Sequence, residues 1–300
     1  MSRDIKLVCG LFGLENFFPS EGIRSYINIA KEAEALGFDA VSVTDHVVMG
    51  KNLHKYPFGE FPLPSEAPWY EPLSVLNMIG SHTTSIRLAT AILITPLRNP
   101  ALLAKTAATI DVISNGRLEL GVGLGWQREE FEAAGVDFEN REEIFWETLD
   151  ILKKFWSESP TSHQGKYFQF DDIWCNPKPI QGADIPLLFG IKMNSENAKK
   201  IAAAGDGWIP IKTSRTFIED GSSLLNDAFE QAEKPLPRIR GQLPTITNEQ
   251  GYPDLDKTLE EFEKSYNAGL QEIEFFPINF IQSGEDIKPT LEKIAKLKGI

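Results

Sequence analysis

The chain has 300 residues, which is enough for one large domain or two small ones. Hydrophobic residues make up 42% of it and charged residues 24%, as in ordinary soluble globular proteins. The net charge of −13 argues against nonspecific binding to nucleic acids or to anionic membranes. A small anionic ligand stays open, because backbone amides and one local cation are enough to bind a phosphate.

The cysteines and the first residues bear on the cellular compartment. Cys9 and Cys175 are too few for a disulfide framework, so we expect two reduced thiols. The apolar run at 7–14 is too short for a signal peptide, and no stretch approaches the length of a membrane span. We therefore expect a cytoplasmic protein.

One sequence phrase recurs along the chain: an amphipathic helix, a glycine and then a short apolar strand. It occurs at 35–41, 114–120, 204–209 and 268–273. Glycine just past a helix accepts the left-handed backbone that ends it, and the apolar run that follows has the length of a strand. The phrase is typical of alternating helices and strands.

The whole pattern contains eight candidate strands and eight candidate helices. We expect strands at 5–12, 38–43, 86–94, 118–123, 186–191, 206–211, 238–246 and 271–278. We expect helices at 22–36, 72–82, 100–114, 140–156, 194–204, 215–233, 255–268 and 286–299. This count predicts a single domain that spans residues 1–300. It favours an α/β protein of the closed (β/α)8 TIM-barrel class and disfavours a doubly wound open sheet.

Two connections, 47–71 and 157–185, are too long for simple turns and are rich in aromatic residues. We interpret both as lids or walls over the mouth of the barrel. Residues 47–71 follow a strand, which puts them on the catalytic face, whereas 157–185 follow a helix.

Polar side chains at strand ends are the candidates for chemistry. The second strand ends in Thr44-Asp45-His46, and a carboxylate beside an imidazole either handles a proton or makes structural hydrogen bonds. Arg98, after the third strand, either binds an anion or pairs with an acidic neighbour.

Two further segments are candidates for cofactor contacts. The glycine cluster at 121–125 leads into Trp126, so it is no clean dinucleotide fingerprint. Gly190, Lys192 and Asn194 suit a phosphate at a helix start, or else form an ordinary cap beside a solvated lysine. The four histidines lack metal-ligand spacing, so we expect no metal site.

At this point the residues resemble a known family. Residues 90–137 (TAILITPLRNPALLAKTAATIDVISNGRLELGVGLGWQREEFEAAGVD), with LGFDAVSVTDH at 36–46 and AAAGDGWIP at 202–210, are similar to the luciferase-like flavin oxidoreductases. That resemblance implies a TIM barrel. It also implies either FMN with a separate flavin reductase and oxygen, or the deazaflavin coenzyme F-420. The Thr-Asp-His ending looks more like the deazaflavin branch.

The resemblance also implies roles for individual residues. His46 would lie near the reactive carbon of the ring and Asp45 would help to hold the cofactor. A bulge with a non-proline cis peptide at Ala91–Ile92 would back the ring system. The implied cofactor contacts are Asp45, Thr90, Ala91, Ile92, Gly125, Trp126, Gly190, Lys192 and Asn194.

Three departures from the family pattern matter. Residues 47–50 lack the tryptophan that follows the histidine in sugar-phosphate-oxidising members, and Trp126 replaces their glutamate, which argues against glucose-6-phosphate. Gly190-Ile191 replaces the usual Gly-Gly, which moves the expected phosphate contact to Lys192 and Asn194.

Our leading hypothesis is hydride transfer between coenzyme F-420 and a small organic substrate, with His46 as the acid/base or polarising group. An FMN-dependent monooxygenase and a non-catalytic flavin-binding barrel are the alternatives. The resemblance also implies a homodimer.

Overall fold

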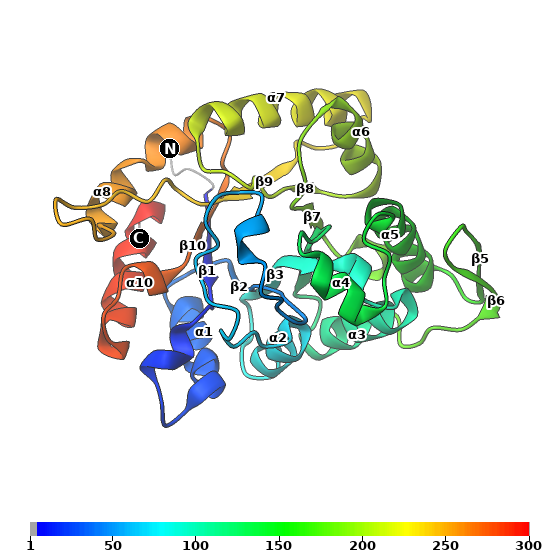
Figure 1. The fold of residues 1–300 in the computed structure, drawn as a ribbon, viewed down its shortest axis with the longest axis horizontal. Coiled ribbons are helices and arrows are strands. Elements are labelled where there is room, and N and C mark those ends of the chain that lie inside the picture. The colour runs from blue at the N-terminus through cyan, green and yellow to red at the C-terminus, as the bar shows by residue number, and fades with distance from the viewer. Residues whose placement is uncertain (1–4, 300) are drawn as a thin grey trace.

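In the computed structural model, which describes residues 5–299, eight parallel strands close into a barrel (Figure 1). Around the barrel the order is β1-β10-β9-β8-β7-β4-β3-β2. The strands are β1 Lys6–Gly10, β2 Ala40–Val43, β3 Arg87–Ile94, β4 Leu118–Gly123, β7 Leu187–Phe189, β8 Gly207–Trp208, β9 Arg238–Gly241 and β10 Glu272–Phe275. Each lies inside a predicted range. The (β/α)8 prediction is confirmed, and the open sheet is wrong.

Helices alternate with these strands and cover the outside of the barrel. They are α1 Ser25–Ala35, α2 Pro72–Gly80, α3 Pro100–Ile113, α4 Arg128–Ala134, α5 Arg141–Ser157, α6 Ser195–Ala204, α7 Arg215–Gln231, α8 Leu255–Glu260, α9 Phe262–Asn267 and α10 Ile287–Ala295. Side-chain caps fix several starts: Asn99 accepts hydrogen bonds at the start of α3, and Asp254 does so at α8. The predicted helix at 255–268 is two helices, and α4 was not predicted.

The amino-terminal end of the barrel is closed by buried charges. Glu119 of β4 accepts hydrogen bonds from Arg87 (Nε, 2.9 Å), Arg238 (Nη2, 2.9 Å) and Arg240. Glu272 of β10 pairs with Arg238 and Arg240 as well. Burial would raise the pKa of Glu119, but the three guanidinium groups hold it well below its usual range. This ionic floor leaves the carboxyl ends of the strands for the site.

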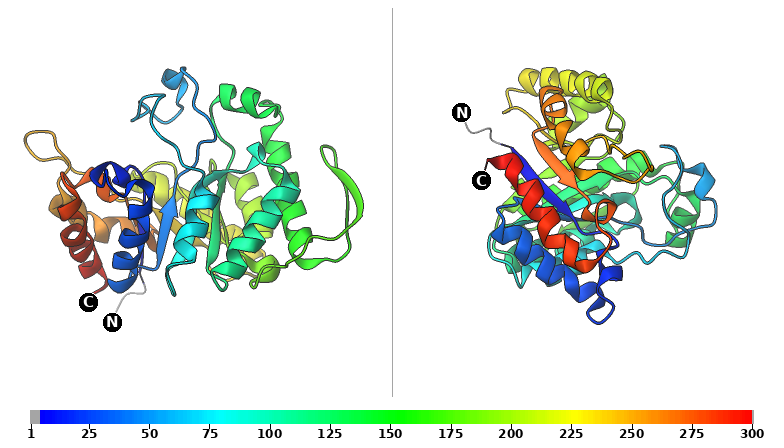
Figure 2. Two further views of the ribbon diagram at one scale, coloured as in Figure 1. Left: turned by 90° about the horizontal axis from the view of Figure 1, so that it is seen from below. Right: turned by 90° about the vertical axis from the view of Figure 1, so that its left-hand side faces the viewer.

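The two long connections lie in different places (Figure 2). Residues 47–71, which we call the lid, rise beside α4 above the carboxyl ends of the strands. Residues 157–185 contain a hairpin, β5 Thr161–Gln164 and β6 Gln169–Ile173, at the side of the molecule.

The hairpin packs on the outside of α5. The ring of Phe170 stacks on Phe155 at a centroid distance of 4.9 Å, and His163 Nε2 lies 3.2 Å from Glu147 Oε1. Placing 157–185 over the mouth was therefore wrong. The reason is that the segment leaves α5 at the amino-terminal end of the barrel, opposite the catalytic face.

No helix within residues 5–299 combines the length and apolar character that crossing a membrane requires.

Candidate active site

His46 is held at the mouth of the barrel by an acidic residue 84 positions further along the chain. β2 ends at Val43, so His46 leaves the barrel at its carboxyl edge, where it is only 8% exposed. Its Nδ1 lies 3.1 Å from Oε2 of Glu130 on α4, and Oε1 of Glu130 accepts the N–H of Val47 at 2.6 Å. A carboxylate partner places a hydrogen on Nδ1 and leaves Nε2 for a reacting group.

Four aromatic rings, Tyr56, Phe61, Trp69 and Trp126, gather at His46; we call them the aromatic cage. The centroids of Trp69, Phe61 and Trp126 lie 4.6, 5.9 and 6.1 Å from that of His46. Tyr56 packs on Phe61 at 5.1 Å and on Trp126 at 5.2 Å. Three of the four rings come from the lid, which therefore shields the imidazole from water.

The turn between β4 and α4 also anchors the lid. Gln127 accepts the N–H of Gly50 at 2.7 Å and donates to its carbonyl at 3.2 Å. Asn52 donates to Glu129, and a Cβ on Gly50 would lie 2.8 Å from the Cβ of Glu129. One short segment thus orients His46 and fixes the base of the lid.

Asp45 has a different partner from the one its sequence position indicated. Its carboxylate accepts two hydrogen bonds from Arg98, at 2.6 and 3.0 Å, and one from the N–H of Ile94 at 2.8 Å. Arg98 thus pairs with acidic neighbours, Glu71 being the other. Arg98 and Glu130 engage Asp45 and His46 separately, so Asp45 takes the structural hydrogen bonds that were one of its two alternatives.

The third strand carries the predicted irregularity. The peptide between Ala91 and Ile92 is cis, and the pairing of β3 with β4 shifts register between Thr90 and Leu93. The hydroxyl of Thr90 donates to the carbonyl of Gly121 at 2.8 Å. The predicted cis peptide at Ala91–Ile92 is confirmed.

Glycines beside this bulge make room for Ile92. A Cβ on Gly123 would lie 2.4 Å from Ile92 Cδ1, and one on Gly190 would lie 2.7 Å from Ile92 Cγ2. At the ends of β3, β4 and β7, the side chain of Ile92 therefore lies between glycines that have no side chain of their own. Such an apolar surface with little side-chain relief suits a flat ring. Gly125 has φ +73° and packs against Ile94 and Phe131, so the turn itself requires that glycine.

The predicted phosphate contacts lie where α6 begins. Asn194 accepts the N–H of Asn197 at 2.8 Å, which makes it the helix cap, and the side chain of Lys192 is exposed. The start of a ten-residue helix with an exposed lysine beside it can hold a phosphate group.

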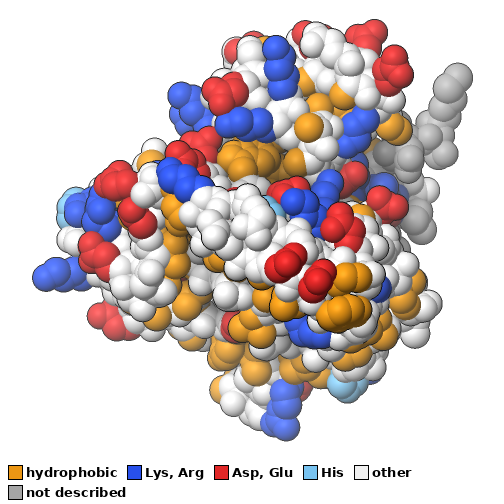
Figure 3. Space-filling view, turned by 90° about the vertical axis from the view of Figure 1, so that its right-hand side faces the viewer, with side chains coloured by type: hydrophobic (Ala, Val, Ile, Leu, Met, Phe, Trp, Pro, Cys, Tyr) orange, Lys and Arg blue, Asp and Glu red, His pale blue; other side chains and the backbone are white. Residues whose placement is uncertain are grey.

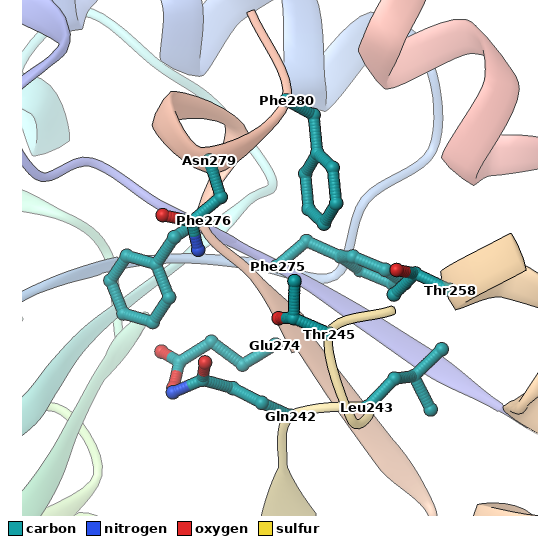
Figure 4. Close-up of a pocket in the computed structure, with 9 residues that line it drawn as sticks. All are labelled: Gln242, Leu243, Thr245, Thr258, Glu274, Phe275, Phe276, Asn279 and Phe280. Atoms are coloured by element: carbon teal, nitrogen blue, oxygen red, sulfur yellow. The ribbon is translucent and has the colours of Figure 1, made fainter. Parts of the chain in front are cut away.

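A small pocket lies at the ends of β9 and β10, beside Thr258 of α8 (Figure 4). The carboxyl group of Glu274 lies beside the amide of Gln242, with Phe276 next to them. Ser42 donates to Glu274, whose pKa is raised by complete burial. A Cβ on Gly10 would lie 2.5 Å from the ring of Phe276.

Two polar atoms of the aromatic cage lack partners. The indole nitrogens of Trp69 and Trp126 are buried, and neither makes a hydrogen bond in the described part of the chain. Unpaired buried donors next to His46 fit a site that receives a ligand with acceptor atoms. Nowhere in 5–299 do three or more His, Cys, Asp or Glu side chains form a group that could hold a metal ion.

A closed parallel barrel with an imidazole and aromatic rings at its carboxyl edge has the architecture of the (β/α)8 enzymes. Residues 13–251 match the family model described as luciferase-like monooxygenase. The chain belongs to this family.

Relatives and solved structures agree with that assignment. The uncharacterized protein Rv0953c of Mycobacterium tuberculosis (strain ATCC 25618 / H37Rv) is 33% identical over 76% of this chain and 82% of its own length. An F420-dependent glucose-6-phosphate dehydrogenase of Amycolatopsis mediterranei (strain U-32) is 24% identical over 85% of this chain and 70% of its own length.

Among solved structures, monooxygenase RslO1 from Streptomyces bottropensis has a TM-score of 0.77 at 20% identity, covering 97% of this chain and 98% of that one. The oxygenating constituent of 3,6-diketocamphane monooxygenase of Pseudomonas putida, in complex with FMN, has a TM-score of 0.74 at 15% identity, covering 99% and 98%. Proteins similar to this chain thus use either F-420 or FMN.

Glu130 and Gln127 are the site residues that sequence reasoning missed. Glu130 lies between two other glutamates, Glu129 and Glu132. From the sequence, it cannot be told apart from these neighbours and is interpreted as a solvated surface charge. A weak signal was present, because Glu130 follows Trp126 by four residues just after a strand end.

Proposed function

We propose that this protein is an oxidoreductase that transfers a hydride between coenzyme F-420 and a small organic substrate. The observation that carries the proposal is His46, fixed by Glu130 at the carboxyl edge of the barrel and enclosed by the aromatic cage. F-420, when bound, would supply or take up the hydride. The bulge at Ala91–Ile92, with Gly123 and Gly190, would hold the ring of the cofactor. Lys192 and the start of α6 would hold a phosphate group.

His46 handles the proton in this proposal. When a carbonyl group is reduced, a hydride adds to its carbon and a proton from Nε2 of His46 adds to its oxygen. In the reverse direction, the oxidation of an alcohol, the hydride leaves the carbon for the cofactor and the hydroxyl proton passes to Nε2 of His46. Glu130 stabilises the imidazolium form through Nδ1, so the ring keeps its orientation in both protonation states.

The aromatic cage supplies the second requirement, which is exclusion of water. The lid carries three of the rings, Tyr56, Phe61 and Trp69. Hydrogen bonds to Gln127 and Glu129 hold the base of the lid. A dry, apolar setting strengthens the interaction between the imidazole and a developing charge on the substrate oxygen.

Binding measurements test the proposal. Purified protein is titrated with F-420 and, separately, with FMN, and cofactor fluorescence is followed. We expect F-420 to bind, and replacing His46 by Ala to abolish turnover while F-420 affinity stays within about threefold, because the imidazole acts on the proton more than on the ring.

An FMN-dependent monooxygenase is the second candidate, favoured by the TM-score of 0.74 to an FMN-bound enzyme. Tight FMN binding without F-420 binding would establish it over the first, and a separate reductase would then supply reduced flavin. A protein that binds the cofactor without any turnover, and whose cofactor binding is unchanged by His46→Ala, would be a non-catalytic flavin-binding barrel.

We also propose that two copies of the chain associate. Exposed apolar side chains lie on α3, such as Leu102 (67% exposed), and on the segment after β6, at Trp174 (63%) and Ile180 (56%). Ile180 lies against Gly116, just past the end of α3. Figure 3 views the side that carries β5 and β6 and shows bands of hydrophobic side chains between charged ones. Such a surface favours a second copy of the chain over water.

A further inference from the structure

Two indole N–H groups in the aromatic cage have no acceptor among residues 5–299. Trp69 Nε1 belongs to the lid and Trp126 Nε1 to the turn after β4, and both atoms are buried. A buried donor without a partner is costly and rare in folded proteins. Two of them beside one imidazole point to a ligand that supplies the missing acceptors.

The neighbouring polar side chains do not serve these donors: Glu129 Oε2 is also buried and bonds neither indole, and Glu130 and Gln127 are engaged elsewhere. Both carboxylate oxygens of Glu130 are engaged, by His46 and by the N–H of Val47. The side-chain amide of Gln127 bonds to Gly50 in both directions. The cage therefore offers donors and one imidazole nitrogen to whatever enters it.

The rest of the cage is Tyr56, whose hydroxyl is polar, and the apolar Phe61. Phe61 lies between the two indoles, with centroids 6.3 Å from Trp69 and 5.4 Å from Trp126. A polyol would bring hydroxyl donors that need acceptors of their own. A cation would be attracted by the ring faces but would leave both N–H groups unpaired.

We propose that Trp69 and Trp126 determine specificity, their N–H groups binding the acceptor oxygen of a small, mostly apolar carbonyl compound. The inference rests on the proposed function and deepens it, since the same oxygen would take the proton from His46.

The placement of Trp69 assigns its N–H group to the substrate more than to the cofactor. Trp69 packs on Phe12, which follows β1, with centroids 4.9 Å apart. The bulge at Ala91–Ile92, with Gly123 and Gly190, belongs to β3, β4 and β7, on the other side of β2 in the barrel. His46, which follows β2, thus stands between the proposed cofactor surface and Trp69.

The test follows the indole N–H resonances of the six tryptophans. Protein labelled with 15N-tryptophan is titrated with cyclohexanone and with methylenecyclohexane, which has the same shape but a CH2 group in place of the oxygen. Each titration is run on the protein alone, with F-420 and with FMN. Trp69→Phe and Trp126→Phe assign the two resonances and keep an aromatic ring at each position.

We expect cyclohexanone, but not methylenecyclohexane, to move the Trp69 and Trp126 resonances downfield. Trp146 is the internal control, because its Nε1 is also buried and unpartnered but its ring stacks on Phe189 beside α5. Each Trp→Phe variant should lower the affinity for cyclohexanone about tenfold, the usual effect of losing one hydrogen bond.

Equal shifts with both probes, or none under all three conditions, would overturn the inference. So would a fall in cofactor affinity in the Trp→Phe variants with cyclohexanone binding unchanged, since the donors would then belong to the cofactor. That last outcome leaves the proposed function standing. Failure of F-420 to bind sinks the proposed function, while the titration of the protein alone still tests the two donors.

Discussion

Glu130 does two things at once, because its oxygens bind the imidazole of His46 and the backbone of the next residue. The orientation of the ring and the path of the chain into the lid therefore depend on one carboxylate. A residue with this arrangement positions the acid/base group without touching the substrate.

Replacing Glu130 by Gln tests that role. The amide keeps the size of the side chain but cannot stabilise an imidazolium, so we expect kcat to fall about 100-fold. Cofactor affinity should stay the same, and the pH dependence of kcat should change. Glu132→Gln on the exposed face of α4 is the matched control. Equal activity in the two variants would contradict the assignment.

Asp45 serves stability in the structure. Its bidentate pair with Arg98 is buried, whereas the second partner of Arg98, Glu71, is 47% exposed in its side chain. Asp45→Ala should lower the free energy of unfolding by about 3 kcal/mol, because it leaves a largely buried guanidinium with one partly exposed acidic partner. Glu71→Ala should cost less than about 1 kcal/mol. Urea denaturation measures the free energy of unfolding of both variants. Similar losses would show that the buried pair contributes no more to stability than the exposed one.

At the scale of elements, the features that could be predicted from the sequence are those set locally. The glycine after a helix and the apolar run that follows predicted four of the eight strands, short apolar runs predicted the others, and resemblance predicted the cis peptide at Ala91–Ile92. The helix α4 was missed because seven residues hold too little periodicity. The segment 157–185 was misplaced because aromatic content shows that a loop packs, but not which element it packs against.

The contacts of the site could not be predicted in the same way. Glu130 and His46 are 84 positions apart, and their meeting depends on how the turn after β4 folds over the barrel. Trp69 reaches His46 from the far end of the lid. Sequence position located His46, but closure of the barrel selected its partners.

Glu34 of α1 holds the segment before β3 in place. Its Oε1 accepts the N–H groups of Thr84, Ser85 and Ile86 and the hydroxyl of Ser85. Partial burial alone would raise the pKa of Glu34, but these hydrogen bonds lower it from 4.5 to about 2. The ionised form therefore stabilises the fold above pH 4.5, and this contribution is lost as the pH falls from about 4.5 towards 2.

Glu34→Gln should lower Tm at pH 7 by about 2–4 °C, since solvent screens part of the effect. The difference from the parent protein should shrink between pH 4.5 and pH 2. Glu230→Gln, at an exposed position on α7, is the control and should show no such dependence. Thermal unfolding followed by circular dichroism gives both curves, and a difference independent of pH would refute the role of the charge.

At the scale of the whole molecule, the barrel separates stability from chemistry along its axis. The amino-terminal end is closed by Glu119, Glu272 and their arginines, which are satisfied mostly by one another. The carboxyl end carries His46, the bulge of β3 and the lid. Because the two ends share only the strands between them, the mouth can vary with the substrate while the floor keeps the barrel closed.

The outer surface of α3 gives the last prediction. If two copies associate through it, Leu102→Asp places a charge in an apolar interface and should convert a dimer to a monomer. Leu236→Asp is the control, because Leu236 is 74% exposed but lies before β9, away from α3. Size-exclusion chromatography with light scattering gives the mass of each variant across a range of concentrations. A parent protein with the mass of one chain would refute the dimer, and a dimer that survives Leu102→Asp would show that another surface forms it.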